Sequence, residues 1–83
     1  MNAPTHLVYV TDSEPAPRFS DLENVMCIRP LERRDSSVIP AGTIGTVLLV
    51  LGAGAAYEVE FGETLVDLLT VNAEDLAPAN DVE

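Results

Sequence analysis

Hydrophobic and polar residues alternate most regularly at positions 56–61, which read Ala-Tyr-Glu-Val-Glu-Phe. A period of two is typical of a β-strand with one buried face, so we expect Tyr57, Val59 and Phe61 to point into a core. The hydrophobic segment 44–51 precedes this strand. A glycine-rich loop, residues 52–55, separates the two segments, and together they predict a β-hairpin.

Two more segments extend this hairpin into a sheet. Residues 24–29 include four consecutive hydrophobic residues and are followed by Pro30, which predicts a short strand. Residues 64–71 predict another strand, because they follow a Gly62-Glu63 dipeptide that suits a two-residue type II′ turn. A charged loop, residues 32–37, lies between the first strand and the hairpin.

The remaining turns complete the expected fold. Gly42 and Gly45 have the spacing of a tight turn that enters a strand, where a missing Cβ permits positive φ or a close approach. Asn72 is expected to cap one helical turn that ends with Leu76 in the core. The fold class is therefore all-β: a small five-stranded SH3-like barrel with an N-terminal extension and one short helical turn before the last strand.

Three parts follow one another along the chain. Residues 1–22 are expected to form an N-terminal extension, an arm or an edge strand, because the strand-like segment 7–10 precedes a proline-containing linker. Residues 23–78 form the barrel, which is the single domain and single core that 83 residues allow. Residues 79–83 are expected to be a disordered tail.

Turn lengths predict which residues face one another. The pairs expected across the first hairpin are Leu51 with Ala56, Val50 with Tyr57, and Leu49 with Glu58. The two-residue turn at Gly62-Glu63 places Glu58 opposite Asp67. The residues expected in the core are Ile44, Leu48, Val50, Tyr57, Val59, Phe61, Val66 and Leu68. The large hydrophobic residues expected on the outer face are Val47, Leu49, Leu51, Leu65 and Leu69.

The outer face of the hairpins is the candidate binding site, because it combines exposed hydrophobic side chains with carboxylates. Its expected members are Leu49, Leu51, Glu58, Glu60, Leu65, Asp67 and Leu69. Opposed carboxylates destabilise a sheet unless solvent, a cation or a basic group compensates them. A large apolar patch marks an interface. Either residues 1–22 fold back over it, with Leu7, Tyr9 or Phe19 as the plug, or a foreign partner covers it.

Charge is distributed unevenly along the chain and restricts the partners. The net charge is −10, and residues 35–83 carry nine acidic residues and no basic one. Nucleic acids and anionic membranes would be repelled by that half, because they bind through cationic side chains. We expect a basic protein partner, or self-association as a homo-oligomer once salt screens the charge.

Residues able to carry out catalysis are few. Cys27 lies in a hydrophobic strand without a neighbouring base, so it is expected to be a buried hydrophobic residue. His6, the sole histidine, lies far from Cys27 in the sequence, so the two cannot make a zinc site. No Ser-His-Asp set is possible beyond that single histidine, and we expect no catalytic residue, metal or cofactor. Arg29, Arg33 and Arg34 form the basic cluster; they either pair with Glu32 and Asp35 or contact an acidic partner.

The signals for membranes and secretion are absent from the sequence. The longest apolar run, residues 47–51, is far shorter than the roughly 20 residues that span a bilayer. Residues 1–4 lack the charged and apolar regions of a secretory signal. With one cysteine and no internal disulfide possible, these features favour a cytoplasmic protein.

Four segments resemble one protein family: residues 42–50, 56–61, 68–71 and Asp75-Leu76. Together they are similar to the bacterial domain of unknown function 4926 family over residues 24–78. That resemblance implies a small SH3-like barrel, related in shape to KOW-type domains and to the β-subunit barrel of nitrile hydratases. It implies no catalytic residue. Two departures are a shorter loop after Phe61 and a leucine, Leu49, where a polar residue is expected.

These observations predict a non-enzymatic module for protein–protein interaction that binds a basic protein, with an antitoxin or immunity-type role as a specialisation. An accessory or regulatory subunit of a larger enzyme, comparable to the nitrile hydratase barrel, is the alternative. A KOW-like nucleic-acid binder is a third class, which the acidic C-terminal half opposes.

Overall fold

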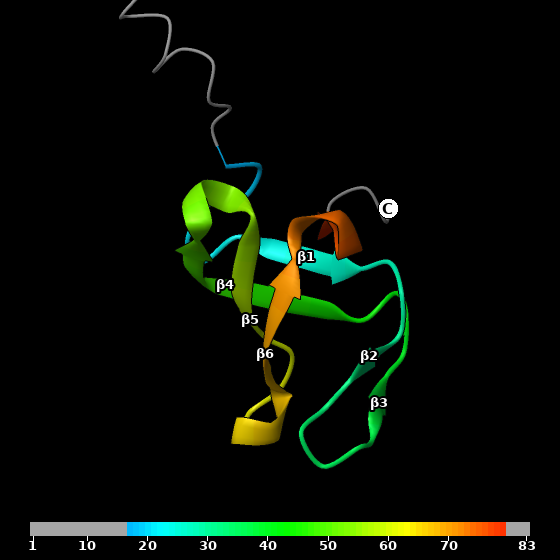
Figure 1. Cartoon of the computed structure of the whole chain (residues 1–83). Helices are drawn as coiled ribbons and strands as arrows, with labels where there is room; N and C mark the ends of the chain where they lie inside the picture. The colour runs from blue at the N-terminus through cyan, green and yellow to red at the C-terminus, as the bar shows by residue number, and fades with distance from the viewer. Residues whose placement is uncertain (1–16, 80–83) are drawn as a thin grey trace, which may run out of the picture.

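The structure, a computed structural model, describes residues 17–79 (Figure 1). The strands and 3₁₀ turns are, in chain order, β1 (Asn24–Cys27), β2 (Leu31–Glu32), β3 (Val38–Ile39), β4 (Ile44–Leu51), η1 (Gly52–Gly54), β5 (Ala56–Glu60), η2 (Leu65–Asp67), β6 (Leu68–Asn72), η3 (Ala73–Asp75) and β7 (Leu76–Pro78). No α-helix occurs among these residues.

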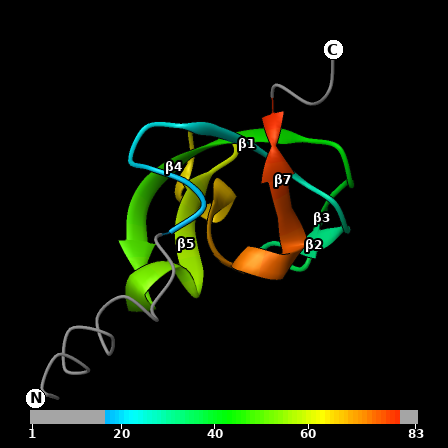
Figure 2. The ribbon, with the colours of Figure 1, turned by 90° about the horizontal axis from the view of Figure 1, so that it is seen from above.

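Five strands form one antiparallel sheet in the order β6-β5-β4-β1-β7, and β2 and β3 form a separate hairpin. Seen from above, the strands curl around a central core (Figure 2). Within residues 17–79, no ladder joins the two edge strands β6 and β7, so the barrel stays open there. The prediction of an all-β, five-stranded SH3-like fold is confirmed, and the short turn η3 does precede the last strand.

The core is formed by one or two side chains from each of several elements. Tyr57 and Val59 of β5 are fully buried, as the alternation predicted. Leu76, which follows η3, is buried as expected, although the Asn72 side chain makes no capping hydrogen bond. The nine buried core residues are Phe19, Val25, Cys27, Ile39, Val47, Tyr57, Val59, Val71 and Leu76.

Phe19, from the expected extension, belongs to this core. Its ring packs edge-on against Tyr57 at a centroid distance of 5.3 Å. The Tyr57 hydroxyl accepts hydrogen bonds from the backbone N–H groups of Arg18 and Phe19, which satisfies a buried polar atom. Phe19 therefore does not plug the outer face. Leu7 and Tyr9 lie outside the described residues.

The β4–β5 ladder follows the predicted register at the loop end and then departs from it. Leu51 lies opposite Ala56, Val50 opposite Tyr57 and Leu49 opposite Glu58, as expected. A bulge then separates Leu49 from Val47. One inserted residue reverses the alternation of side chains.

Because of this bulge, three predictions for β4 are wrong. Val47, expected outside, lies opposite Val59 in the core. Leu48 and Ile44, expected in the core, are 39% and 43% exposed.

Gly45 explains how β4 can bend to pair with both β1 and β5. A Cβ at this position would lie 2.7 Å from Val59 Cγ1 and 2.9 Å from the carbonyl oxygen of Glu60. Only a residue without a side chain permits this close approach, as the sequence predicted. The preceding turn also has the predicted geometry, with Gly42 at a φ of +93°.

The connection from β5 to β6 is longer than predicted. In place of a Gly62-Glu63 turn, a 3₁₀ turn precedes β6, and the strand begins at Leu68. Thr64 explains the difference: its hydroxyl donates to the Asp67 carboxylate, and its carbonyl accepts from the Asp67 N–H. Such local hydrogen bonds compete with strand pairing.

The longer connection shifts the register of β6. Glu58 lies opposite Thr70, and Val59 lies opposite Leu69. The predicted Glu58–Asp67 pair is therefore wrong. Leu69, expected on the outer face, packs against the core, and Val66 lies half-buried in η2. Leu68, expected in the core, lies opposite Glu60 on the outer side.

Candidate functional site

Four leucines and two glutamates surround the bulged end of β4. Leu49 is 52% exposed and lies directly opposite Glu58, whereas Leu51 is half-buried at the end of the strand. Glu60 shares the outer side of β5 with Glu58, because alternate residues of a strand point the same way. We call this surface the leucine–glutamate face: Leu22, Leu48, Leu49, Leu51, Glu58 and Glu60.

Leu22 joins this face through the backbone of β4. Val47 accepts a 2.6 Å hydrogen bond from the Leu22 N–H and donates one to the Glu23 carbonyl, which holds the backbone of Leu22 against β4 next to the Val47–Leu48 peptide. The Leu22 side chain is 74% exposed, and its φ of 68° lies in the left-handed region. A leucine there is both strained and solvated, so its position brings no gain to the core.

The charge of the face is negative. Glu58 is half-buried and accepts a hydrogen bond from the Thr70 hydroxyl, which holds its carboxylate in place. Glu60 is exposed and lies between Thr46 and Leu68. The strands β4, β5 and β6 carry no lysine or arginine. The face therefore offers apolar contact together with uncompensated negative charge.

Three predicted site residues do not join this face. Leu69 turns inward against the core. Leu65 is 74% exposed, but it belongs to η2, at the opposite end of the β5–β6 pair from η1. Asp67 forms an ion pair with Arg33. Of the seven predicted residues, the structure thus brings together Leu49, Leu51, Glu58 and Glu60.

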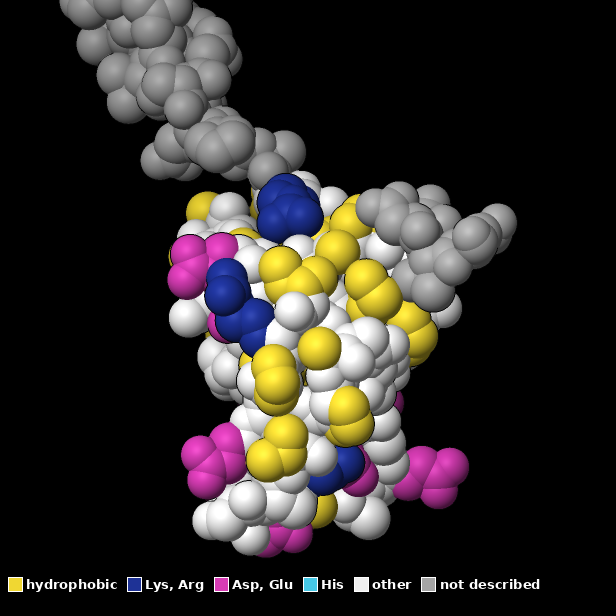
Figure 3. Space-filling model, turned by 90° about the vertical axis from the view of Figure 1, so that its right-hand side faces the viewer, with side chains coloured by type: hydrophobic (Ala, Val, Ile, Leu, Met, Phe, Trp, Pro, Cys, Tyr) yellow, Lys and Arg dark blue, Asp and Glu magenta, His cyan; other side chains and the backbone are white. Residues whose placement is uncertain are grey.

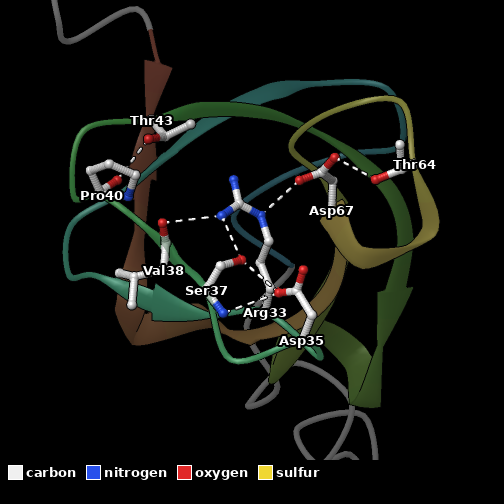
Figure 4. Close-up of polar contacts among 8 residues, drawn as sticks. All are labelled: Arg33, Asp35, Ser37, Val38, Pro40, Thr43, Thr64 and Asp67. Atoms are coloured by element: carbon white, nitrogen blue, oxygen red, sulfur yellow. Dashed lines mark hydrogen bonds and ion pairs between the residues drawn. The ribbon is translucent and has the colours of Figure 1, made fainter.

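The Arg33 side chain connects the β2–β3 hairpin to η2 (Figure 4). Its Nε donates to Asp67 Oδ1 at 2.8 Å, and its Nη1 donates to the Ser37 hydroxyl and the Val38 carbonyl. The Thr64 hydroxyl and then the Arg33 guanidinium hold the pKa of Asp67 below its ordinary value. Hydrogen bonds from the Ser37 hydroxyl and N–H likewise lower the pKa of Asp35. This network is structural, because its members satisfy one another.

Arg29 and Arg33 have partners that the sequence did not indicate. Arg29 pairs with Asp75, whose hydrogen bond and charge raise the pKa of the guanidinium. Arg33 pairs with Asp67. The predicted pairs with Glu32 and Asp35 do not form among the described residues. The ion pairs are long-range in sequence, so local spacing could not reveal them.

A second apolar surface lies near the other end of β4. Met26 lies opposite Ile44 on one side and Ala77 on the other, all on the outer side of the sheet. Figure 3 shows hydrophobic side chains in a band on the side of the molecule that carries the β2–β3 hairpin, with basic and acidic side chains at its margins. This band differs from the leucine–glutamate face, which includes no lysine or arginine.

Residues capable of metal binding or nucleophilic chemistry do not gather in the described chain. Cys27 is fully buried, as predicted, and its thiol donates to the Pro40 carbonyl at 3.2 Å. Residues 17–79 contain no group of three metal-ligating side chains. Across the same residues, no helix is long and apolar enough to cross a membrane. His6 lies outside the described residues.

In comparisons with known proteins, no family model, curated protein or solved structure matches the chain. The resemblance to the domain of unknown function 4926 family therefore stays a prediction.

Sequence reasoning missed Leu22 and Leu48. The signal at Leu22 was a hydrophobic residue inside the polar turn Ser20–Glu23, where the Glu23 carboxylate accepts from the Ser20 N–H. Leu48 gave no signal, because the continuous hydrophobic run 47–50 hides the bulge.

Proposed function

We propose that the protein is a non-enzymatic interaction module that binds a basic protein through the leucine–glutamate face. The observation that carries this proposal is the pairing of Leu49, 52% exposed, with the half-buried carboxylate of Glu58. The pair is central to the face. A partner that covers it would bury hydrophobic surface and meet negative charge at the same point.

The hydrophobic part of the face supplies affinity. Complete burial of one leucine side chain is worth about 1.5–3 kcal/mol relative to exposure. Leu22, Leu48 and Leu49 are all substantially exposed, so a partner that covers them gains from three side chains. Part of that gain offsets the entropy lost on association.

The acidic part selects the partner. Glu58 and Glu60 lie on a sheet without basic residues, in a protein of net charge −10. Lysine or arginine side chains placed opposite them would speed association and exclude acidic competitors. Such binding weakens as salt is added, because exposed charges are screened. The same charge opposes binding of nucleic acids.

An antitoxin or immunity-type role is a specialisation of this function, in which the basic partner is a toxic protein. A regulatory subunit would instead use the same face to stay bound to one larger enzyme. Gene neighbourhood separates the two, since a neutraliser is expected beside a toxin gene and a regulatory subunit beside a metabolic gene.

Affinity capture from native cells tests the proposal, with the full chain tagged and the eluate analysed by mass spectrometry at low and moderate salt. We expect one dominant basic protein that is lost on adding salt. Leu49→Arg should abolish its capture, since it puts positive charge at the centre of the face. Leu65→Arg is the matched control, because Leu65 is equally apolar, exposed and outside the face. Equal capture by both variants, or no basic protein with the wild type, would reject the proposal.

A further inference from the structure

The edge strand β6 (Figure 1) pairs with β5 on one side, and no strand of the described chain pairs with its other side. We propose that this free edge pairs with β6 of a second copy of the chain, in an antiparallel arrangement about a two-fold axis at Thr70. The proposal concerns a different surface from the leucine–glutamate face and does not depend on it.

The direction of the backbone groups in β6 follows from the residues on either side of it. The Asp67 carbonyl accepts from the Phe61 N–H, and the Ala73 N–H donates to the Ala55 carbonyl, so residues 67 and 73 face β5. The β5–β6 ladder is regular between them. Alternate residues of an antiparallel strand point their N–H and C=O groups to opposite sides. The residues whose groups point away from β5 are therefore Leu68, Thr70 and Asn72; of these, the Leu68 N–H already donates to the Leu65 carbonyl.

The other edge of the sheet is blocked. In β7, the Leu76 N–H donates to the Ala73 carbonyl, and the Leu76 carbonyl accepts from the Arg18 guanidinium. Pro78 has no N–H to offer. Proteins commonly protect edge strands by proline, charged side chains or bulges. None of these devices occurs in β6, which is five residues long and uncharged.

A second copy suits the free edge because β6 is complementary to itself. With the axis at Thr70, the two threonines lie opposite each other, and Leu69 of each copy faces Val71 of the other. The Asn72 N–H then donates to the Leu68 carbonyl of the second copy, whereas the Leu68 N–H stays bonded to the Leu65 carbonyl of its own chain. Threonine pairs and aliphatic pairs are favourable across strands. No charged side chain of β6 opposes another, although each copy carries a net charge of −10.

The effect of salt distinguishes this self-association from the proposed binding of a basic partner. Two chains of the same net charge repel, so screening by salt should strengthen the dimer. Binding of a basic partner should weaken under the same conditions. Failure of one proposal therefore leaves the other intact, and the two outcomes are read from opposite salt dependences.

Sedimentation equilibrium of the full chain at low and high salt tests the proposal. We expect the wild type to approach the mass of two chains, with a dissociation constant that falls as salt rises. Thr70→Pro removes the N–H at the axis without removing a bond to β5, which an edge strand tolerates. We expect it to raise the dissociation constant about tenfold to a hundredfold, because two symmetry-related hydrogen bonds are lost.

If circular dichroism shows that Thr70→Pro does not fold, Thr70→Lys is the second variant to test. It places two like charges at the axis, while within one chain the lysine lies beside Glu58. Thr46→Lys is the control, because Thr46 lies opposite Glu60 on a central strand. Dimer loss at Thr70 alone supports the proposal. Two results would overturn the proposal. One is a wild-type chain that stays monomeric up to about 1 mM. The other is a dimer that Thr70→Lys does not affect.

Discussion

Leu49 and Glu58 lie directly opposite each other in the β4–β5 ladder, at the first regular pair after the β4 bulge. The bulge turns Leu48 outward beside Leu49 while Val47 enters the core. One inserted residue therefore supplies a core side chain and enlarges the exposed apolar surface around a carboxylate. The candidate site thus depends on the same irregularity that completes the core.

Leu49→Arg should leave the fold intact. Leu49 is 52% exposed, so its replacement removes little buried surface, and an arginine there lies opposite Glu58. We expect the free energy of unfolding to change by no more than about 0.5 kcal/mol. Urea denaturation measures this change. A variant that unfolds would mean that Leu49 belongs to the core.

Val59→Asp should unfold the chain. Val59 is fully buried opposite Val47, and an aspartate there has no basic partner in the core. Burial of an unpaired charge should cost about 4 kcal/mol or more, a large share of the stability of a small domain. Circular dichroism and thermal melting measure the loss. Leu65→Asp is the control, because Leu65 is an exposed leucine. If Val59→Asp folds as well as this control, the buried and outer faces of the sheet have been assigned the wrong way round.

Gly45→Ala should destabilise the protein by about 1–3 kcal/mol, the usual cost of overpacking. The added methyl would meet Val59 Cγ1 at 2.7 Å and the Glu60 backbone at 2.9 Å, and the backbone contact cannot be relieved by a side-chain rotation. Thr46→Ala, one residue along the same strand, should cost less. Chemical denaturation of both variants gives the comparison, and equal losses would argue against close strand approach at Gly45.

Acid should weaken the junction between η2 and the β2–β3 hairpin. The Thr64 hydroxyl and the Arg33 guanidinium lower the pKa of Asp67 from its ordinary value of 3.8. A carboxylate with a lowered folded-state pKa stabilises the fold above its unfolded-state pKa. That contribution is lost as pH falls through the folded-state pKa.

Asp67→Asn should therefore flatten the dependence of stability on pH below about pH 4, where the unfolded carboxyl takes up its proton. Part of the dependence should remain, because the Asp35 pKa is lowered as well. Urea midpoints between pH 7 and pH 2 provide the measurement. Superimposable profiles for wild type and Asp67→Asn would show that the Arg33–Asp67 pair contributes nothing to acid stability.

Local sequence patterns were sufficient to predict the central β4–β5 hairpin. The alternation around Tyr57 and the glycine-rich loop predicted three of its cross-strand pairs correctly. Gly42, Gly45 and Leu76 also took the predicted roles, although the Asn72 side chain makes no capping hydrogen bond.

The predictions failed where contacts beyond the local sequence determine which way a residue points. The bulge at Leu48 lies in an unbroken hydrophobic run, so no polar residue marked the change of face. The turn before β6 combines local hydrogen bonds between Thr64 and Asp67 with an ion pair to Arg33, which lies 34 positions before Asp67. The bulge added Leu48 to the candidate site, and the turn before β6 removed Leu65, Asp67 and Leu69 from it.

Amide chemical-shift mapping with the captured basic protein tests the central claim most directly. We predict that the largest changes occur at Leu48, Leu49 and Glu58 and that they diminish as salt is added. The amide of Leu65 should change little. Changes confined to Met26, Ile44 and the β2–β3 hairpin, or changes unaffected by salt, would contradict binding of a basic partner at the leucine–glutamate face.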